Sequence, residues 1–195
     1  MEFINSKTIR LDKAENDLDR FAVDFSTIIE KHTKHVIISG YVAILFGRNR
    51  ASEDIDVFVE GFQDFEKFYR EIHEKGYWIL NHDNSKDAHS MIKDGLAIRI
   101  ARKNQWLPNF EIKMPKRDTD FYSLQNRITV LMKSGKLLIG PLELGIAFKL
   151  FLSSEKDIED ARFLYKLFQD RLDIGNLEHF AKNLKVLSLY EKYLL

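Results

Sequence analysis

The most constraining feature of this sequence is the segment at residues 34–60, where a tight turn and a polar connection join three short apolar runs. Residues 35–38 are mostly β-branched and too few for a helix, so they predict a buried strand that stops at Ser39 and Gly40. The apolar residues 41–46 then predict one short helix pressed into a core, and Gly47 is placed to close it as a left-handed cap.

The turn at Ser39 and Gly40 has a chemical consequence. It leaves backbone N–H groups free at the start of the helix expected at residues 41–46. Free N–H groups at a helix N-terminus favour an anion, because they point at it and the helix dipole is positive there. The turn therefore predicts a binding site for phosphate.

A second strand is expected at residues 54–59, where charged and apolar residues alternate. With a period of two, Asp54 and Asp56 lie on the same face, roughly 7 Å apart along the backbone, and the residues between them enter the core. Two carboxylates so close repel each other unless they lie in full solvent or hold cations between them. Paired oxygen ligands of this kind suit hard ions such as Mg²⁺ or Mn²⁺.

These positions together form one ordered pattern: a small residue, Gly, Ala, a second Gly, and then Arg-x-Ser-x-Asp-x-Asp. It is filled here by Ser39, Gly40, Ala43, Gly47, Arg50, Ser52, Asp54 and Asp56. The pattern resembles the signature of the nucleotidyltransferase-fold superfamily, and most nearly its AbiEii-like and small archaeal stand-alone members. The resemblance implies an α+β (mixed α/β) fold, in which a nucleotidyltransferase-like mixed sheet is flanked by helices.

A downstream block extends this resemblance over most of the chain. The block consists of Gly140, Pro141, Glu143, Leu144, Lys149, Leu150, Lys156, Asp157 and Asp160. In AbiEii-like proteins the matching lysine reaches the phosphates, which implies that role for Lys149, with Lys156, Asp157 and Asp160 lining the same cleft. The alternative is ordinary helix chemistry, since acidic residues in a first turn complement the helix dipole and helix lysines are usually solvated.

The resemblance also implies nucleotide-binding roles for residues around the turn and the polar connection. Ser39 and Gly40 would hold the terminal phosphates, and Arg48, Arg50 and Ser52 would assist. For Arg50 a structural role remains open, in which its guanidinium anchors the turn to a carboxylate.

A third carboxylate is expected in this family on a strand soon after the aspartate pair. No acidic residue occurs between Leu96 and Asn109, so Glu111 is the best candidate. Alternation in residues 110–114 puts Glu111 and Lys113 on one face, which would let Glu111 join Asp54 and Asp56 in a metal site. The alternative is a surface Glu-x-Lys pair worth only tenths of a kcal/mol.

Composition limits the partners. Lys+Arg and Asp+Glu balance at 30 each over 195 residues, so there is no overall field to attract nucleic acid, and a polyanion contact must come from a local patch. The densest basic neighbourhood, interleaved with Trp106, comprises Arg99, Arg102, Lys103, Lys113, Lys116 and Arg117. It could contact a nucleic-acid acceptor or simply protect a sheet edge.

Cysteine and hydropathy patterns bear on location. The chain has no cysteine, which excludes disulfides, thiolate metal sites and cysteine nucleophiles. No apolar run approaches twenty residues, and the first ten residues lack a hydrophobic signal region. We expect a cytoplasmic protein without a membrane partner.

The remaining elements follow from periodicity and turn residues. Helices are expected at 13–31, 62–72, 142–152, 155–168 and 177–193. Strands are expected at 3–11, 77–80 and 110–114, with hairpins of 88–93 with 96–101 and of 128–131 with 136–139, and a charged connection at 115–120. The expected layout is a nucleotidyltransferase-like core at 1–140 and a helical C-terminal portion at 141–195.

Taken with the resemblance, these residues give a first functional hypothesis. The protein would be a Mg²⁺-dependent nucleotidyltransferase that moves a nucleoside monophosphate from an NTP, with ATP expected, to an acceptor hydroxyl. The acceptor would be a tRNA end or other RNA, a protein as in toxin–antitoxin systems, or a small molecule. The alternative is a non-catalytic nucleotide-binding or interaction module on the same fold, and a third is a structural partner whose acidic pair merely faces water.

Overall fold

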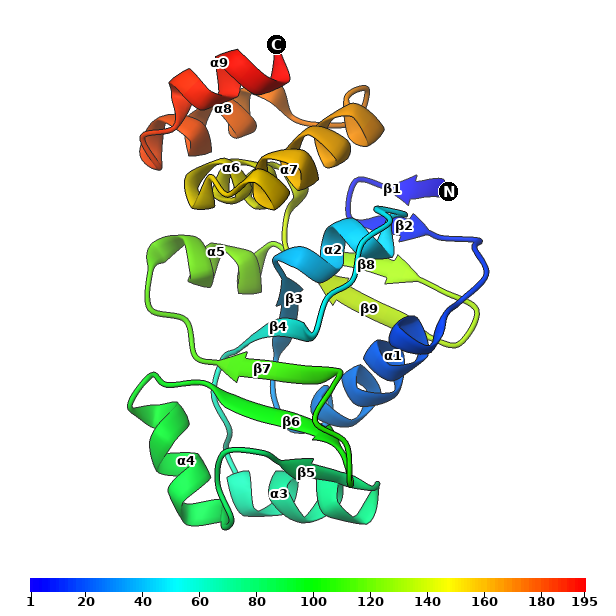
Figure 1. The fold of residues 1–195 in the computed structure, drawn as a ribbon, viewed down its shortest axis with the longest axis vertical. Coiled ribbons are helices and arrows are strands. Elements are labelled where there is room, and N and C mark those ends of the chain that lie inside the picture. The colour runs from blue at the N-terminus through cyan, green and yellow to red at the C-terminus, as the bar shows by residue number, and fades with distance from the viewer.

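A computed structural model describes residues 1–195 and shows one mixed sheet of nine strands with helices around it (Figure 1). In order across the sheet, the strands are β1 (Glu2–Asn5), β2 (Thr8–Arg10), β8 (Ile128–Leu131), β9 (Lys136–Ile139), β3 (His35–Ile38), β4 (Asp54–Val59), β7 (Asn109–Lys113), β6 (Ile98–Arg102) and β5 (Tyr77–Ile79). β4 pairs antiparallel with β3 and parallel with β7, so β4 joins the two halves of the sheet.

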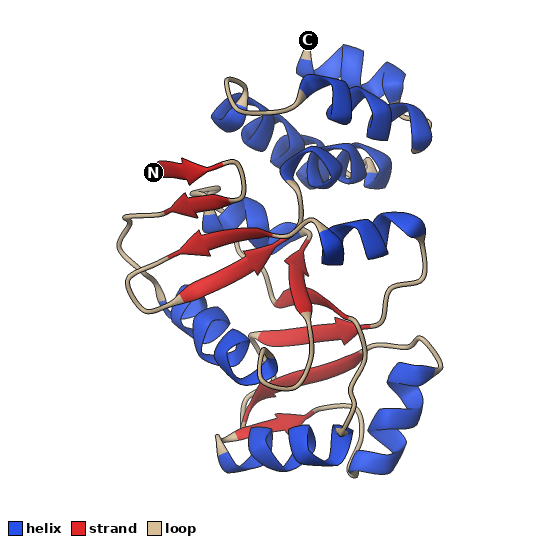
Figure 2. Cartoon of the chain, turned by 180° about the vertical axis from the view of Figure 1, so that it is seen from behind, coloured by secondary structure: helices blue, strands red, loops and turns tan.

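The helices are α1 (Asp17–Ile29), α2 (Gly40–Leu45), α3 (Phe65–Glu74), α4 (Ser85–Lys93), α5 (Asp118–Gln125), α6 (Leu142–Leu152), α7 (Glu155–Phe168), α8 (Ile174–Asn183) and α9 (Leu187–Leu194). α1 covers one face of the sheet, α5 packs on the opposite face against β3 and β4, and other helices lie at both ends of the sheet. Figures 1 and 2 show α6 to α9 grouped at one end of the sheet and α3 with α4 at the other.

The core on the α1 side decides which way the middle strands face. Phe21 and Phe25 of α1 stack on Phe110 of β7, with ring centroids 4.5 and 4.2 Å apart. Ile55 and Val57 of β4 are buried in the same core. Since side chains alternate along a strand, the polar residues of β4 and β7 must lie on the opposite face.

The expected mixed α/β fold is confirmed, and several elements agree closely. The hairpin of 128–131 with 136–139 and the helices at 142–152 and 155–168 have the expected bounds. The strand at 35–38 and the short helix after it are also present, and Gly47 has the left-handed backbone expected of a cap, with φ at 111°. The division into portions 1–140 and 141–195 stays a prediction.

The strand expected at residues 88–93 is wrong, because this segment forms α4. The side chain of Asn84 accepts a hydrogen bond from the backbone N–H of Asp87 and so caps the helix. Ala88 and Ile92, four residues apart, are buried on one helical face. Gly95, expected to make a hairpin turn, instead follows the helix with φ at 76° and donates to the Ile92 carbonyl.

Three other expectations need correction. The charged connection at 115–120 contains the start of α5, because the carboxylate of Asp120 accepts the backbone N–H groups of Lys116 and Arg117, both at 3.0 Å. The helix expected at 177–193 divides into α8 and α9 at Lys185, whose φ is 59°. The edge strand expected at 3–11 is a hairpin of β1 with β2.

None of the helices combines the length and apolar content that crossing a bilayer requires.

Candidate functional site

The three predicted carboxylates lie on neighbouring strands of the sheet. Asp54 and Asp56 are on β4, and Glu111 is on β7, the strand that pairs parallel with it. In this pairing Asp56 is the register partner of Glu111, so their side chains leave the same face side by side. Strand pairing therefore places Glu111 beside Asp56, on the face that also carries Asp54.

A lysine occupies the space between two of these carboxylates. Nζ of Lys113 donates to Oδ1 of Asp56 at 3.0 Å and to Oε1 of Glu111 at 3.5 Å. The other oxygen of Glu111 accepts a hydrogen bond from Arg99 Nη2 at 3.3 Å. The carboxylates of Asp56 and Glu111 are thus aimed at a shared positive charge.

The pKa of Asp54 is raised by its surroundings in this arrangement. Partial burial raises the pKa of its carboxyl above the usual value, and the charges of Asp56 and Glu111 raise it further. Its neighbour Ser52 donates its hydroxyl to the backbone carbonyl of Asp54 at 3.0 Å, which fixes the start of β4. The nucleotide-binding role of Ser52 stays a prediction.

The donor set suits a hard divalent ion, and the ammonium of Lys113 is a stand-in cation already held by two of the carboxylates. No group of three or more histidine, aspartate or glutamate side chains converges closely enough in this structure to hold a metal. The residues fit Mg²⁺ in their chemistry and strand register, provided that Lys113 withdraws from between Asp56 and Glu111. The metal site stays a prediction.

The predicted phosphate-binding turn follows the C-terminal end of β3, the strand that pairs with β4. Ile38, the last residue of β3, is the register partner of Asp56, and Ser39 and Gly40 follow it directly. Ser39 has φ at 65°, a left-handed backbone that sharply redirects the chain from β3 into α2. The turn and the aspartates are therefore neighbours across one pair of antiparallel strands.

A small apolar cavity of about 60 Å³ adjoins this turn. Its lining comes from the strand ends, α5 and the C-terminal helices, and includes Ile38, Ser39, Phe58, Ser123, Phe148 and Lys149. Ligand pockets usually measure roughly 300 to 1,000 Å³, so this cavity is too small for a nucleoside unless its walls move.

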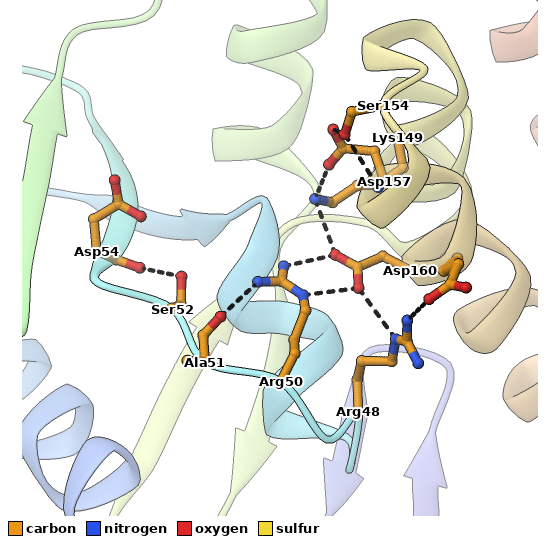
Figure 3. Close-up of polar contacts among 10 residues, drawn as sticks. Arg48, Arg50, Ala51, Ser52, Asp54, Lys149, Ser154, Asp157 and Asp160 are labelled. Atoms are coloured by element: carbon orange, nitrogen blue, oxygen red, sulfur yellow. Dashed lines mark hydrogen bonds and ion pairs between the residues drawn. The ribbon is translucent and has the colours of Figure 1, made fainter.

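A buried ion cluster connects the loop after α2 to the C-terminal helices (Figure 3). We call it the Asp160 cluster, and it consists of Arg48, Arg50, Lys149, Asp157 and Asp160. Asp160 is completely buried and accepts hydrogen bonds from Arg50 Nε at 3.0 Å and Nη2 at 2.7 Å. Such a bidentate pair is among the strongest side-chain contacts in proteins.

The remaining members complete the charge balance of the Asp160 cluster. Lys149 Nζ lies 2.6 Å from Asp157 Oδ1 and 3.1 Å from Asp160 Oδ2. Arg48 contributes its Nε at 3.5 Å from Asp160 Oδ1 and also pairs with the carboxylate of Glu159. The carboxylate anchor that the sequence left open for Arg50 is thus present.

This cluster bears on the predicted phosphate ligands. Lys149 is only 4% exposed, lines the cavity beside Ser39 and already contacts two carboxylates. Lys156 lies in the first turn of α7, next to Asp157, and is exposed. Phosphate contacts by Lys149, Lys156 and Asp157 stay predictions, and a contact by Lys149 would require it to exchange a carboxylate for a phosphate.

Sequence reasoning missed the contribution of α5. Its residues Thr119, Asp120 and Ser123 line the same cavity as Ser39. The available signal was the acidic residue three positions after Arg117, which is typical of a helix N-terminus.

Comparison with solved structures identifies the fold. An antigenic nucleotidyltransferase-like protein from Paracoccidioides brasiliensis aligns over 87% of each chain, with 14% identity and a TM-score of 0.50. JHP933 from Helicobacter pylori aligns over 92% of this chain and 81% of its own, with 18% identity and a TM-score of 0.46. A tRNA nucleotidyltransferase complexed with a primer tRNA and an incoming ATP analogue aligns over 86% of this chain and 59% of its own, with 16% identity and a TM-score of 0.33.

No protein-family model and no curated protein sequence matches the chain significantly. At these identities the structural likeness establishes the fold alone, which is nucleotidyltransferase-like. The assignment to AbiEii-like or archaeal stand-alone members stays a prediction.

Proposed function

We propose that this protein, starting from a nucleotidyltransferase-like fold, transfers a nucleoside monophosphate from an NTP to an acceptor hydroxyl. Mg²⁺ or Mn²⁺ is the proposed cofactor and ATP the proposed donor. The acceptor belongs to RNA, to a protein or to a small molecule, and a role in a toxin–antitoxin system is one setting for a protein acceptor.

The observation that carries the proposal is the register of β4 with β7. This register aligns Glu111 with Asp56, two positions from Asp54. Asp56 also pairs with Ile38, the residue directly before the turn at Ser39 and Gly40. Asp54, Asp56 and Glu111 would hold the metal, and bound Mg²⁺ would neutralise triphosphate charge and polarise the phosphate oxygens. The three carboxylates and the turn would thus orient one triphosphate.

The chain's own residues account for the rest of the transfer. The acceptor oxygen forms a bond to the α-phosphorus while the bond from that phosphorus to the pyrophosphate breaks. The proton of the acceptor hydroxyl passes to solvent water, because Asp54, Asp56 and Glu111 would all be engaged as metal ligands. The backbone N–H groups at Ser39 and Gly40 would retain the terminal phosphates until pyrophosphate leaves.

The test is transfer of label from α-labelled NTPs to total cell RNA and protein in the presence of Mg²⁺. We expect a labelled acceptor with the wild type and none with Asp54→Ala or Glu111→Gln. Glu60→Gln is the matched control, because Glu60 is an exposed carboxylate just beyond β4 and does not belong to the proposed site. Equal labelling by wild type and Asp54→Ala would contradict the proposal.

A second candidate function is favoured by one contact. Lys113 fills the space between Asp56 and Glu111, and a site neutralised in this way can bind a nucleotide without catalysing transfer. Calorimetry with NTP separates the two candidates. Tight NTP binding without labelling of any acceptor class supports the non-catalytic module, and labelling that depends on Asp54 supports the enzyme.

A further inference from the structure

The chain has two tryptophans, and they lie against each other. The ring centroids of Trp78 and Trp106 are 5.7 Å apart in an edge-to-face arrangement. Nε1 of Trp78 donates to the backbone carbonyl of Gln105 at 3.0 Å, which ties the loop that carries Trp106 to β5. Trp106 is nevertheless 66% exposed, so the pair presents a large aromatic surface to solvent.

Strand register places this pair on the same face as the candidate carboxylates. Trp78 of β5 is the partner of Ala101 in β6, Ala101 is the partner of Asn109 in β7, and Asn109 is the partner of Asp54 in β4. Residues paired across a sheet share a face. At about 4.8 Å between neighbouring strands, Trp78 lies on the order of 14 Å from Asp54 along one row of the sheet.

The other face of the same strands is covered. Tyr77, next to Trp78, turns into the core and packs against Phe21 and Phe25 of α1, with ring centroids 6.0 and 5.3 Å apart. α1 therefore packs on the face opposite to the tryptophans. The aromatic pair stands on the side of the sheet that carries Asp54 and Glu111.

The adjacent row of the sheet and the next loop are cationic. Arg99 is the register partner of Glu111 and its side chain is 56% exposed. The segment from Leu96 to Pro108 contains Arg99, Arg102 and Lys103 and no acidic residue, although the whole chain has no net charge. Arg102 turns to Asp24 of α1 at 2.7 Å, and Arg99 pairs with Glu111 at 3.3 Å. Lys103 is exposed in the loop that follows β6, three residues before Trp106.

We propose that the exposed surface formed by Trp78, Arg99 and the loop residues Lys103 and Trp106 binds a single-stranded segment of a nucleic-acid acceptor. This inference rests on the proposed function, because it names the acceptor of the same site. Exposed aromatic rings stack with unpaired bases of any sequence, and neighbouring cations neutralise the phosphates. Ala101 and Asn109, which lie between Trp78 and Asp54 in this row, are buried, and Asn109 donates to the backbone carbonyl of Trp106. A strand stacked on Trp106 would therefore pass over these two residues to bring its reacting hydroxyl to Asp54.

Single strands fit this surface better than duplexes do. In a duplex the bases stack on each other, and only an end pair has a free face for a tryptophan. The surface also has two aromatic rings and only two nearby cations that do not already turn to α1, which is too few phosphate contacts for strong duplex binding.

Tryptophan fluorescence tests the proposal directly, because both reporters lie on the proposed surface. The full chain is titrated with single-stranded oligouridylate and oligoadenylate, with a blunt RNA duplex and with ATP, in the absence of Mg²⁺. We expect single strands to quench the fluorescence at concentrations where the duplex and ATP leave it nearly unchanged.

Variants identify the surface. Trp106→Ala is expected to weaken single-strand binding about fivefold or more, measured by anisotropy of a labelled oligonucleotide. Phe151→Ala is the matched control, since it removes an exposed aromatic ring on α6. Far-ultraviolet circular dichroism and gel filtration verify that both variants keep the fold and the oligomeric state of the wild type.

The outcomes are decisive in both directions. Equal affinity of wild type and Trp106→Ala for single strands, equal quenching by the duplex, or a change of oligomeric state in Trp106→Ala alone would overturn the proposal. ATP binding measured by calorimetry keeps the two hypotheses apart. Trp106→Ala should retain it, whereas loss of ATP binding by the wild type would count against the proposed function and not against this surface.

Discussion

The ammonium of Lys113 lies 3.0 Å from Oδ1 of Asp56 and bridges the two parallel strands that carry the candidate carboxylates. Burial alone would lower the pKa of Lys113, but the carboxylates of Asp56 and Glu111 raise it above the usual value. The lysine is therefore charged at neutral pH. It occupies the position that a divalent ion would share with the same oxygens.

Replacing Lys113 by Met should tighten divalent metal binding. The substitution removes one positive charge from between two carboxylates, and opposite charges a few ångströms apart interact by about 4 kcal/mol at the effective dielectric of a protein surface. After the cost of bringing the carboxylates together, we expect Mn²⁺ affinity to rise on the order of tenfold. Calorimetric titration with Mn²⁺ measures the change.

Lys93→Met is the control for this prediction, because Lys93 is exposed at the end of α4 and forms no ion pair with the site carboxylates. It should bind Mn²⁺ as the wild type does. Unchanged or weaker Mn²⁺ binding by Lys113→Met would show that the carboxylates do not form a metal site.

Local patterns in the sequence predicted the parts of the site that depend on neighbouring residues. Alternation alone put Asp54 and Asp56 on one face of β4, and the turn at Ser39 followed from the break between two apolar runs. The position of Glu111 beside Asp56 depends on the pairing of β4 with β7, which periodicity does not encode. Sequence could therefore nominate Glu111 but not place it.

The misassigned elements show the same limit. Asp94 and Gly95 fit a hairpin turn and a helix end equally well, and packing of Ala88 and Ile92 in the core decides for the helix. The helix break at Lys185 has no glycine to announce it. The pairing of Arg50 with Asp160 joins residues 110 positions apart, so no local signal could have predicted it.

Gly40 and Arg50 should be energetically coupled. A Cβ added at Gly40 would lie 2.5 Å from Nη2 of Arg50, so Gly40→Ala must shift the guanidinium and strain its bidentate pair with Asp160. We expect Gly40→Ala to lower the free energy of unfolding by about 1 to 3 kcal/mol. In an Arg50→Ala background the same substitution should cost close to nothing, because the displaced group is gone.

Urea unfolding of the four proteins in this double-mutant cycle measures the coupling. Gly145→Ala serves as the control, since its added Cβ would meet no atom within 4 Å beyond its own stretch of helix, and alanine is favoured over glycine within a helix. Additive losses in the double variant would mean that Gly40 is required for a reason other than the approach of Arg50.

His35 should make stability depend on pH. Its side chain is 1% exposed and neither ring nitrogen has a hydrogen-bond partner, so burial lowers its pKa from 6.5 to about 4. Between these values the unfolded chain binds a proton and the folded chain does not. Stability is therefore lost as pH falls from 6.5 toward 4, by up to about 1.4 kcal/mol per pH unit, and this loss ends below 4.

The comparison with His35→Leu isolates this contribution. Between pH 7 and pH 5, urea unfolding should show the wild type losing about 2 kcal/mol more than His35→Leu does. His73→Leu, which removes an exposed histidine, should follow the wild type. Parallel pH profiles for wild type and His35→Leu would mean that the ring is protonated in the folded protein.

The downstream block of the sequence contains one buried lysine, Lys149, and one exposed lysine, Lys156, and substitutions at the two should differ in their effect on stability. Lys149 neutralises Asp157 and Asp160, so Lys149→Met leaves buried carboxylates short of a partner and should cost about 3 to 5 kcal/mol in the free energy of unfolding. Lys156→Met should change it by less than about 0.5 kcal/mol, because the side chain is exposed.

Nucleotide affinity then tests whether either lysine also contacts phosphate. Calorimetry with ATP, at a temperature where both variants remain folded, should show weaker binding for Lys149→Met if its ammonium exchanges a carboxylate for a phosphate. Lys149 and Ser39 line the same cavity, so the ammonium faces the turn where the phosphates are proposed to bind only after it leaves Asp157 or Asp160. If folded Lys149→Met binds ATP with full affinity, the predicted phosphate contact of Lys149 is wrong. Its role is then to hold α6 and α7 together through Asp157 and Asp160.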